Sequence, residues 1–338
     1  MNSTKSQTQK TDFPSLLERY FCEYLLKQRN ASPETISSYR DTFRLFLQFS
    51  QQRFRKAPAS LTLGDLDAAQ ILAFLDTLES QRHNCVRSRN LRLAVLRSFL
   101  RYAALQDPTA SASITRALAI PVKRFDRGVV SYLSREEMTS LLNAPNPSTW
   151  GGHRDGVMLA TMYNTGARVS EITKLNVEDL QFGPTTTLRI RGKGRKERVI
   201  PLWKSTRRQL RDWTGQIRTT PGSPLFPSRR GERLTRAGVR SRLDAALSVA
   251  RQTCATLRHR QVSPHRVRHS TAMHLLQSGV DITVIALWLG HESTATTHMY
   301  VEAALAMKKR AIDKITMPAA GRRKFKPSDR LLAFLETP

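Results

Sequence analysis

The pattern of apolar and polar positions is helical throughout the stretch from Pro14 to about Ala104. The segment SLLERYFCEYLLKQR carries apolar side chains that recur at helical spacing: Leu17, Phe21, Tyr24 and Leu25. The segment SPETISSYRDTFRLFLQF opens on Ser32, a helix-capping residue type, and on Pro33, which suits the first helical position. Two similar segments follow, DAAQILAFLDTLES and NCVRSRNLRLAVLRSFLRYA. This pattern predicts a compact domain of four or five helices.

The helical pattern is interrupted between residues 107 and 130, where prolines, small residues and basic residues dominate. We expect residues 1–12 to be disordered, a first domain over 13–112 and an interdomain linker over 113–130. Structure restarts at Ser134 and Glu137, which have the spacing of a capping box. We therefore expect a second domain over 131–316, followed by a basic tail over 317–338.

The second domain mixes helices with one strand region. A helix is expected to end at Gly166, and later helices at Gly279 and Gly290. Between them, TTTLRIRGKGRKERVIPL has two β-prone arms on either side of a turn rich in glycine and lysine. The expected fold class is therefore an all-α domain followed by a mostly α domain with a small antiparallel hairpin.

The chain is strongly basic, with 338 residues and a formal net charge of +28. Such a field attracts polyanions, so nucleic acid is the first candidate partner and an acidic membrane surface the second. No apolar run is long enough to span a bilayer, and the N-terminus lacks the apolar core of a signal peptide, so we expect a soluble, cytoplasmic protein. The three scattered cysteines predict neither disulfides nor a thiolate metal site.

The last helix of the first domain carries a row of arginines. Its apolar positions leave some of them on the opposite side, where they can be a solvated face or contact phosphates. The candidate DNA contacts here are Arg87, Arg89, Arg92 and Arg97, with Arg101 in the same row.

The stretch SPHRVRHS raises the question of a metal site. On a helix that begins near Pro264, His265 and His269 share a face, as two zinc ligands would. Arg268 shares that face and would repel a cation, and Arg266 stands where a metalloprotease has its glutamate. An imidazole beside a guanidinium suits a phosphate instead, so we expect no metal.

Four segments together resemble the tyrosine recombinase, or phage integrase, family, and most closely its Xer-like members. They are TGARVSEI, GKGRKERVIPL, SPHRVRHSTAMHLLQSGVDITVIALWLGH and STATTHMY, which occur in the family's order between about Leu133 and Tyr300. The helical first domain is similar to the family's SAM-like core-binding domain. The resemblance implies the two-domain fold described above and an enzyme that needs no cofactor.

The resemblance places the family's catalytic residues at Arg168, Lys193, His265, Arg268, His291 and Tyr300. It implies that Tyr300 attacks the DNA phosphate, that His265 assists as a base or proton relay, and that Arg168 and Arg268 stabilise the transition state. It also implies that His291 donates to the phosphate and that Lys193 protonates the leaving oxygen.

Other interpretations of these residues remain open. Arg168 can simply pair with Glu171, and His291 can cap the preceding helix. Lys196 lies in the same turn as Lys193 and is a second candidate DNA contact. Other polar residues receive no catalytic role: we expect His269, His274 and His298 to be structural or surface residues, and Asp155 and Glu171 to hold arginines in position.

The implied function is site-specific recombination of double-stranded DNA through a 3′-phosphotyrosyl intermediate and strand exchange by four protomers on two sites. The biological role would be integration or transposition of a mobile element, or DNA resolution, with sister recombinases as further candidate partners. The alternatives are a type IB topoisomerase and a non-catalytic DNA-binding regulator. The apolar residues of the tail, from Leu331 to Leu335, would dock on a neighbouring protomer or fold back in cis.

Overall fold

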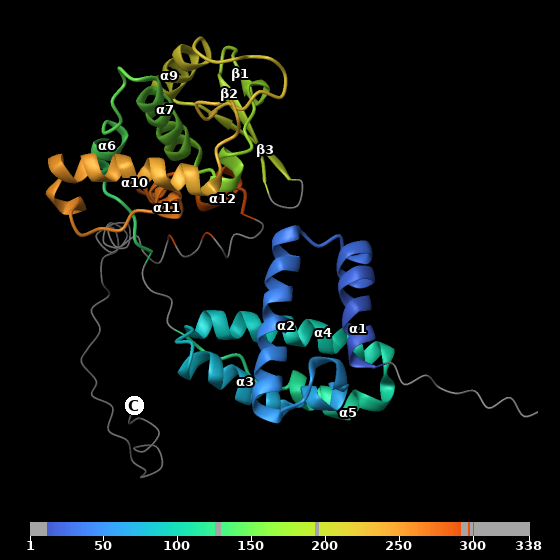
Figure 1. Ribbon diagram of the computed structural model, residues 1–338. Helices are drawn as coiled ribbons and strands as arrows, with labels where there is room; N and C mark the ends of the chain where they lie inside the picture. The colour runs from blue at the N-terminus through green and yellow to red at the C-terminus, as the bar shows by residue number, and fades with distance from the viewer. Residues whose placement is uncertain (1–11, 126–129, 193–195, 292–296, 298–299, 301–338) are drawn as a thin grey trace, which may run out of the picture. The chain divides into compact units, whose positions relative to one another are not determined.

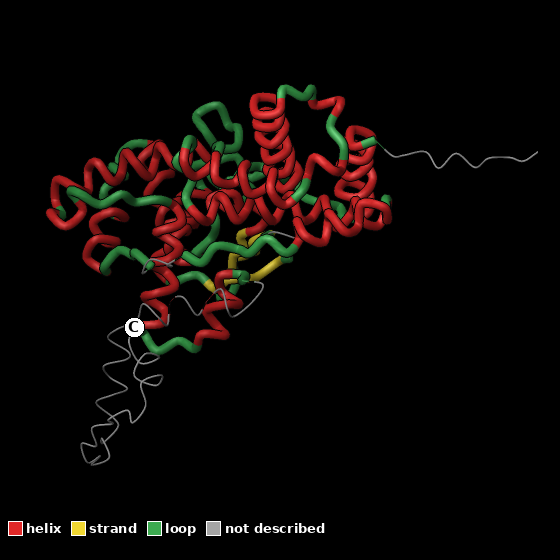
Figure 2. The backbone as a smooth tube through the Cα atoms, turned by 90° about the horizontal axis from the view of Figure 1, so that it is seen from below, coloured by secondary structure: helices red, strands yellow, loops and turns green. Residues whose placement is uncertain are grey.

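The structure is a computed structural model that describes residues 12–125, 130–192, 196–291, 297 and 300. The chain divides into two compact units, Met1–Arg127 and Gly128–Pro338, and each is described by itself (Figure 1). Helix is the main element of both units, and the strands form one small group, shown in yellow in Figure 2. The expected fold class is therefore confirmed.

The first unit is entirely helical within its described residues. Its elements are α1 (Phe13–Arg19), which continues as the π-helical η1 (Tyr20–Gln28), α2 (Pro33–Phe54), η2 (Pro58–Ser60), η3 (Leu63–Leu66), α3 (Ala68–Ser80), α4 (Val86–Gln106), η4 (Pro108–Ala110) and α5 (Ser111–Leu118). The predicted start of α2 is confirmed, because the Ser32 side chain accepts a hydrogen bond from the Thr35 amide and Pro33 occupies the first turn. Aromatic rings packed edge to face fill the core, with Phe99 against Phe13, Tyr20 and Phe43.

The region expected to be a linker, 113–130, begins with ordered structure. Helix α5 packs against α3 and α4, and Ile114, Ala117 and Ile120 are buried in the core of the first unit. Ile114 and Ala117 lie three residues apart on one face of α5, and Ile120 follows just after the helix ends. The expected first-domain boundary at residue 112 is thus too early, because this short amphipathic face completes the core.

The second unit combines helices with a small three-stranded sheet at one side of the unit. Its elements are α6 (Arg135–Leu142), α7 (Trp150–Thr165), α8 (Val169–Ile172), η5 (Val177–Asp179), β1 (Leu180–Gln181), β2 (Thr187–Arg191), β3 (Glu197–Pro201), α9 (Lys204–Thr214), α10 (Arg236–Thr253), η7 (Ala255–Leu257), α11 (Pro264–Gln277) and α12 (Ile282–Leu289). The sheet order is β1-β2-β3, and both pairs are antiparallel. The predicted hairpin is confirmed as β2 and β3, and β1 adds a strand that the pattern did not predict.

Helix ends bring the polar residues of this unit together. The predicted capping box of Ser134 and Glu137 starts α6, and α7 and α12 end at Gly166 and Gly290 in left-handed conformations, as expected. At Gly166 a Cβ would lie 2.5 Å from the Leu289 side chain, so only glycine fits where α7 meets the end of α12. Helix α11 packs against both α7 and α12, so its first turns face these two helix ends.

Candidate active site

Tyr300 lies in the interior of the second unit. Its side chain is only 1% exposed, and its hydroxyl is 2.9 Å from Nδ1 of His269. The His291 ring stacks over it, with the ring planes 9° apart. Burial raises the pKa of Tyr300, and the charges of Arg268 and Arg168 oppose this increase. The phenol therefore stays protonated in the free protein.

Arg268 joins two helix ends beside this tyrosine. Its two terminal nitrogens donate to the carbonyl oxygens of Gly166 and Leu289, each at 2.7 Å. Burial lowers the pKa of Arg268 to about 10, and the charge of Arg168 contributes to this. The guanidinium remains charged at neutral pH and is held by backbone groups, with no carboxylate bonded to it among the described residues. A fixed, uncompensated positive charge of this kind suits a phosphate oxygen.

Arg168 is held in place by a buried carboxylate. Glu171 accepts hydrogen bonds from the Arg168 amide at 2.8 Å and from its guanidinium at 3.0 Å. Arg198 donates to both oxygens of Glu171, at 3.1 and 2.7 Å, and to the Trp288 carbonyl at 2.9 Å. Burial alone would raise the pKa of Glu171, but the hydrogen bond and charge of Arg198, and then Arg168, hold it below its ordinary value. Sequence reasoning did not single out Arg198.

The pairing of Arg168 with Glu171 was expected as an alternative to a catalytic role, and the structure shows the pair. The pairing leaves 37% of the Arg168 side chain exposed, so its other N–H groups remain accessible to a ligand. The expectation that Glu171 and Asp155 hold arginines is confirmed, since Asp155 pairs with Arg154 at 2.7 Å. Glu171 can therefore hold Arg168 in position while Arg168 contacts a phosphate.

The two histidines of SPHRVRHS lie in contact, but they differ in their relation to Tyr300. The rings of His265 and His269 are 4.3 Å apart between centroids, and the hydroxyl of Tyr300 bonds to His269. His269 was expected to be a structural or surface residue, and the structure places its ring against the Tyr300 hydroxyl. The pKa of His269 is lowered to about 4 by burial and by the nearby His265 and Arg268. A neutral ring can accept the phenol proton at Nδ1 when its other nitrogen carries the hydrogen.

His265 and His291 flank this pair. His265 is exposed in the first turn of α11, and its pKa is lowered by surrounding protein atoms and by the charges of Arg268 and Arg168. The His291 amide donates to the Ala286 carbonyl at 2.9 Å, which is the helix-capping role considered from sequence. Its Nδ1 lies 2.8 Å from the Thr297 hydroxyl, and burial followed by nearby arginines lowers its pKa to about 4. A neutral His291 retains a second ring nitrogen for other contacts.

The structure places the two lysine candidates differently. Lys193 lies outside the described residues. Lys196 is exposed at the hairpin, where its carbonyl accepts from the Gly192 amide at 2.7 Å. The tail from Leu331 to Leu335 and His298 also lie outside the described part of the chain.

The arginine row on α4 does not form a single exposed stripe. Arg89 is 2% exposed and donates to Asn90 and the Pro121 carbonyl. Arg92 donates to the Ser38 carbonyl and the Thr42 hydroxyl, and Arg97 donates to the Ile120 carbonyl. The expectation of a DNA contact is wrong for Arg89, because it is used to tie the chain after α5 to α4. Arg87 is exposed and lies over the Phe125 ring.

Two further features bear on the class of protein. Within the described ranges, no group of three histidine, cysteine, aspartate or glutamate side chains is arranged to hold a metal ion. No helix in that part of the chain is both long and apolar enough to cross a membrane.

A helical domain followed by a mostly helical domain, in which arginines and histidines surround a buried tyrosine, defines a tyrosine recombinase. The chain belongs to the phage integrase family. The model of that family matches residues 131–307, and the model of the phage integrase N-terminal SAM-like domain matches residues 18–107.

Relatives and a solved structure agree with this assignment. The chain is 50% identical over 331 residues to the integrase/recombinase y4rC of Sinorhizobium fredii, covering 98% of this chain and 99% of the relative. It is 32% identical over 297 residues to tyrosine recombinase XerC of Pelobacter propionicus, covering 88% of this chain and 93% of the relative. It is similar in fold to the XerH recombinase in a post-cleavage complex with a palindromic difH substrate, with a TM-score of 0.68, 20% identity and coverage of 85% and 81%.

Proposed function

We propose that this tyrosine recombinase cuts and rejoins duplex DNA one strand at a time, with Tyr300 as the nucleophile. The observation that carries the proposal is the position of the Tyr300 hydroxyl, bonded to a neutral histidine in the electrostatic field of Arg268 and Arg168. The net charge of +28 supports DNA as the partner. The named relatives are recombinases.

In the proposed step, the phenolic oxygen forms a bond to phosphorus and the bond from phosphorus to the 5′ oxygen breaks. His269 takes the phenol proton at Nδ1, and the departing 5′ oxygen gains a proton from Lys193. Arg268 and Arg168 stabilise the negative charge on the non-bridging oxygens. The 3′-phosphotyrosyl link retains the energy of the broken bond, so a second strand's 5′-hydroxyl can reverse the step without a cofactor.

His269 takes the part that the family resemblance gave to His265, because His269 is the ring bonded to the phenol. His265 lies against the His269 ring and is exposed, which suits it to exchange a proton with solvent or to contact the phosphate. Burial raises the pKa of Tyr300 further, so the phenol has to give its proton to an acceptor as it attacks the phosphate.

We also propose that four protomers act on two paired sites, as the family resemblance implies, and that the biological role is integration or transposition of a mobile element, or DNA resolution. Docking of the tail from Leu331 to Leu335 on a neighbouring protomer belongs to the same proposal, as does the use of sister recombinases. A cytoplasmic location is part of the same proposal.

The test is covalent capture of DNA on a nicked suicide duplex, with inverted repeats sought in the DNA beside the gene as the candidate site. Wild-type protein and the matched control Tyr163→Phe should both form a covalent adduct that survives denaturing electrophoresis, and Tyr300→Phe should form none. Adduct formation by Tyr300→Phe would show that the nucleophile has been assigned to the wrong residue.

A further inference from the structure

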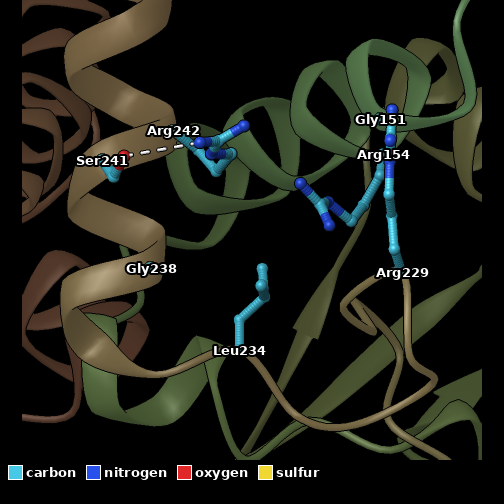
Figure 3. Close-up of a pocket in the computed structure, with 7 residues that line it drawn as sticks. All are labelled: Gly151, Arg154, Arg229, Leu234, Gly238, Ser241 and Arg242. Carbon is cyan, nitrogen blue, oxygen red and sulfur yellow. Dashed lines mark hydrogen bonds between the residues drawn. The ribbon is translucent and has the colours of Figure 1, made fainter.

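A basic pocket lies in the second unit, where the first turns of α7 and α10 approach each other (Figure 3). Its volume is about 310 Å³, and it is lined by three arginines, Arg154, Arg229 and Arg242, together with Gly151, Leu234, Gly238 and Ser241. None of the candidate catalytic residues lines it. The pocket is therefore a separate feature of the second unit.

The pocket has an excess of positive charge. No carboxylate lines it. The lining residue Arg154 donates to Asp155 from Nε at 2.9 Å and from Nη2 at 2.7 Å. Burial raises the pKa of Asp155, while Arg154 and then the charge of Arg242 oppose this. Asp155 can balance only one of the three guanidinium charges. Arg229 and Arg242 are exposed and have no ion pair among the described residues.

Arg154 is pre-positioned by its neighbours. It is buried, its Nη1 donates to the Pro227 carbonyl at 3.0 Å, and its guanidinium lies 5.4 Å from the Trp150 ring centroid. These contacts use three of its five N–H groups, which leaves one on each terminal nitrogen. Figure 3 shows this side chain directed from α7 toward α10. A rigid donor of this kind loses little conformational entropy when it binds a ligand.

Backbone geometry adds to the positive potential. Gly151 lies in the first turn of the 16-residue α7, and Gly238 lies in the first turn of the 18-residue α10. The first turns of both helices, which carry the positive ends of the helix dipoles, therefore lie beside the pocket, and α10 lines it with one side of the helix. At Gly151 a Cβ would meet nothing within 4 Å, so the space beside this turn is open. With three arginines and two helix N-termini close together, the pocket suits a phosphate group that accepts hydrogen bonds from more than one arginine.

We propose that this pocket holds a backbone phosphate of the bound DNA, distinct from the phosphate that Tyr300 attacks. This proposal depends on the proposed function in one respect, namely that the ligand of the protein is DNA. Along α7, Arg154 and Gly166 are 12 residues apart, which corresponds to about 18 Å between the pocket and the helix end at the active site. The pocket is thus an anchor for the duplex away from the point of cleavage.

The test measures how duplex binding depends on salt, in full-length protein that carries Tyr300→Phe so that no cleavage interferes. The probe is a synthetic duplex of arbitrary sequence, because a phosphate contact does not depend on base identity. The variants are Arg242→Gln, Arg229→Gln and their combination. The control is Arg258→Gln, which removes one exposed charge beyond the other end of α10.

The double variant should weaken binding on the order of tenfold and reduce the slope of log K against log salt by about one unit, the value for one phosphate. Because both arginines hold the same phosphate, the slope of log K against log salt should not fall by two units in the double variant. Arg258→Gln should keep the wild-type slope.

Three results would overturn the proposal: an unchanged slope in the double variant, an equal loss in Arg258→Gln, or tight binding of inorganic pyrophosphate that the double variant abolishes without any effect on DNA. The last result would assign the pocket to a free anion. Since the measurement needs no covalent chemistry, a failure of wild-type protein to form the tyrosyl adduct would leave the result for the pocket unaffected.

Discussion

The second unit contains two tyrosine–histidine pairs that look alike in isolation. In one, the Tyr300 hydroxyl is 2.9 Å from Nδ1 of His269, and in the other the Tyr163 hydroxyl is 2.6 Å from Nδ1 of His274. Burial raises the pKa of both tyrosines and lowers the pKa of both histidines. The local pair therefore does not distinguish a nucleophile from a core residue.

The surroundings of the two pairs differ. Tyr300 lies in the field of Arg268 and Arg168. Tyr163 packs edge-on against the Trp203 and His274 rings, and among the described residues the charge that acts on it is that of Arg135. The hydroxyl of Tyr163 needs its histidine because a buried polar group must be hydrogen-bonded. The comparison shows that the reactive tyrosine is defined by the cations around it, since these can bind a phosphate and stabilise its transition state.

The largest effect should come from the cation that only Tyr300 has nearby. Arg268→Lys keeps a charge but cannot bridge the Gly166 and Leu289 carbonyls with a planar fork, so the phosphate donor is misplaced. We expect single-turnover adduct formation to fall by about 10²–10³-fold. Arg135→Lys, beside Tyr163, is the matched control and should keep the wild-type rate. A rate for Arg268→Lys within roughly threefold of wild type would break the comparison.

A smaller effect should follow from removing each histidine. His269→Ala should slow adduct formation by about 100-fold and make the rate rise with pH, because the phenol then has no acceptor and must lose its proton to water. His274→Ala should leave the rate unchanged and lower the free energy of unfolding by about 1–3 kcal/mol, because the Tyr163 hydroxyl loses its partner. Pre-steady-state assays and urea titrations measure the two effects. If His269→Ala, like His274→Ala, lowered the free energy of unfolding and left the rate of adduct formation unchanged, the role of His269 would be structural.

The smallest effect is a dependence of stability on pH, to which the histidine of each pair and His291 should contribute. His269 and His291 have pKa values of about 4, below the ordinary value of 6.5, and the pKa of His274 is also lowered. Between pH 6.5 and about pH 4 the unfolded chain therefore binds protons that the native protein does not. The urea midpoint should be lower at about pH 5 than at about pH 7, and substitution of His269 and His291 by alanine should reduce that difference. Identical midpoints in wild-type protein would show that these histidines are not held neutral.

Local features of the fold could be predicted from the sequence. The Ser32 and Ser134 caps, the helix ends at Gly166 and Gly290 and the β2–β3 hairpin are confirmed, because each depends on neighbouring residues. Strand β1 and the placement of α5 could not be predicted from such local patterns. The two residues of β1 carry no periodicity, and α5 is stabilised by its contacts with α3 and α4.

The same limit applies to the site. The shared face of His265 and Arg268 follows from helical spacing. The contact between His269 and Tyr300 joins residues 31 positions apart and depends on how the chain packs after α12. Arg89 was misjudged for the same reason, since its acceptor is the distant Pro121 carbonyl. Residue type and spacing identified the candidates, and long-range packing decided which side chain touches which.

The central claim is that DNA becomes joined to Tyr300 and not to any other residue. The most direct measurement is mass spectrometry of peptides from the adduct trapped on the nicked duplex, after digestion of both protein and DNA. We expect the peptide that contains Tyr300 to carry a nucleotide through a 3′-phosphate, and the peptide that contains Tyr163 to be unmodified. Attachment at any other residue, or through a 5′-phosphate, would contradict the account.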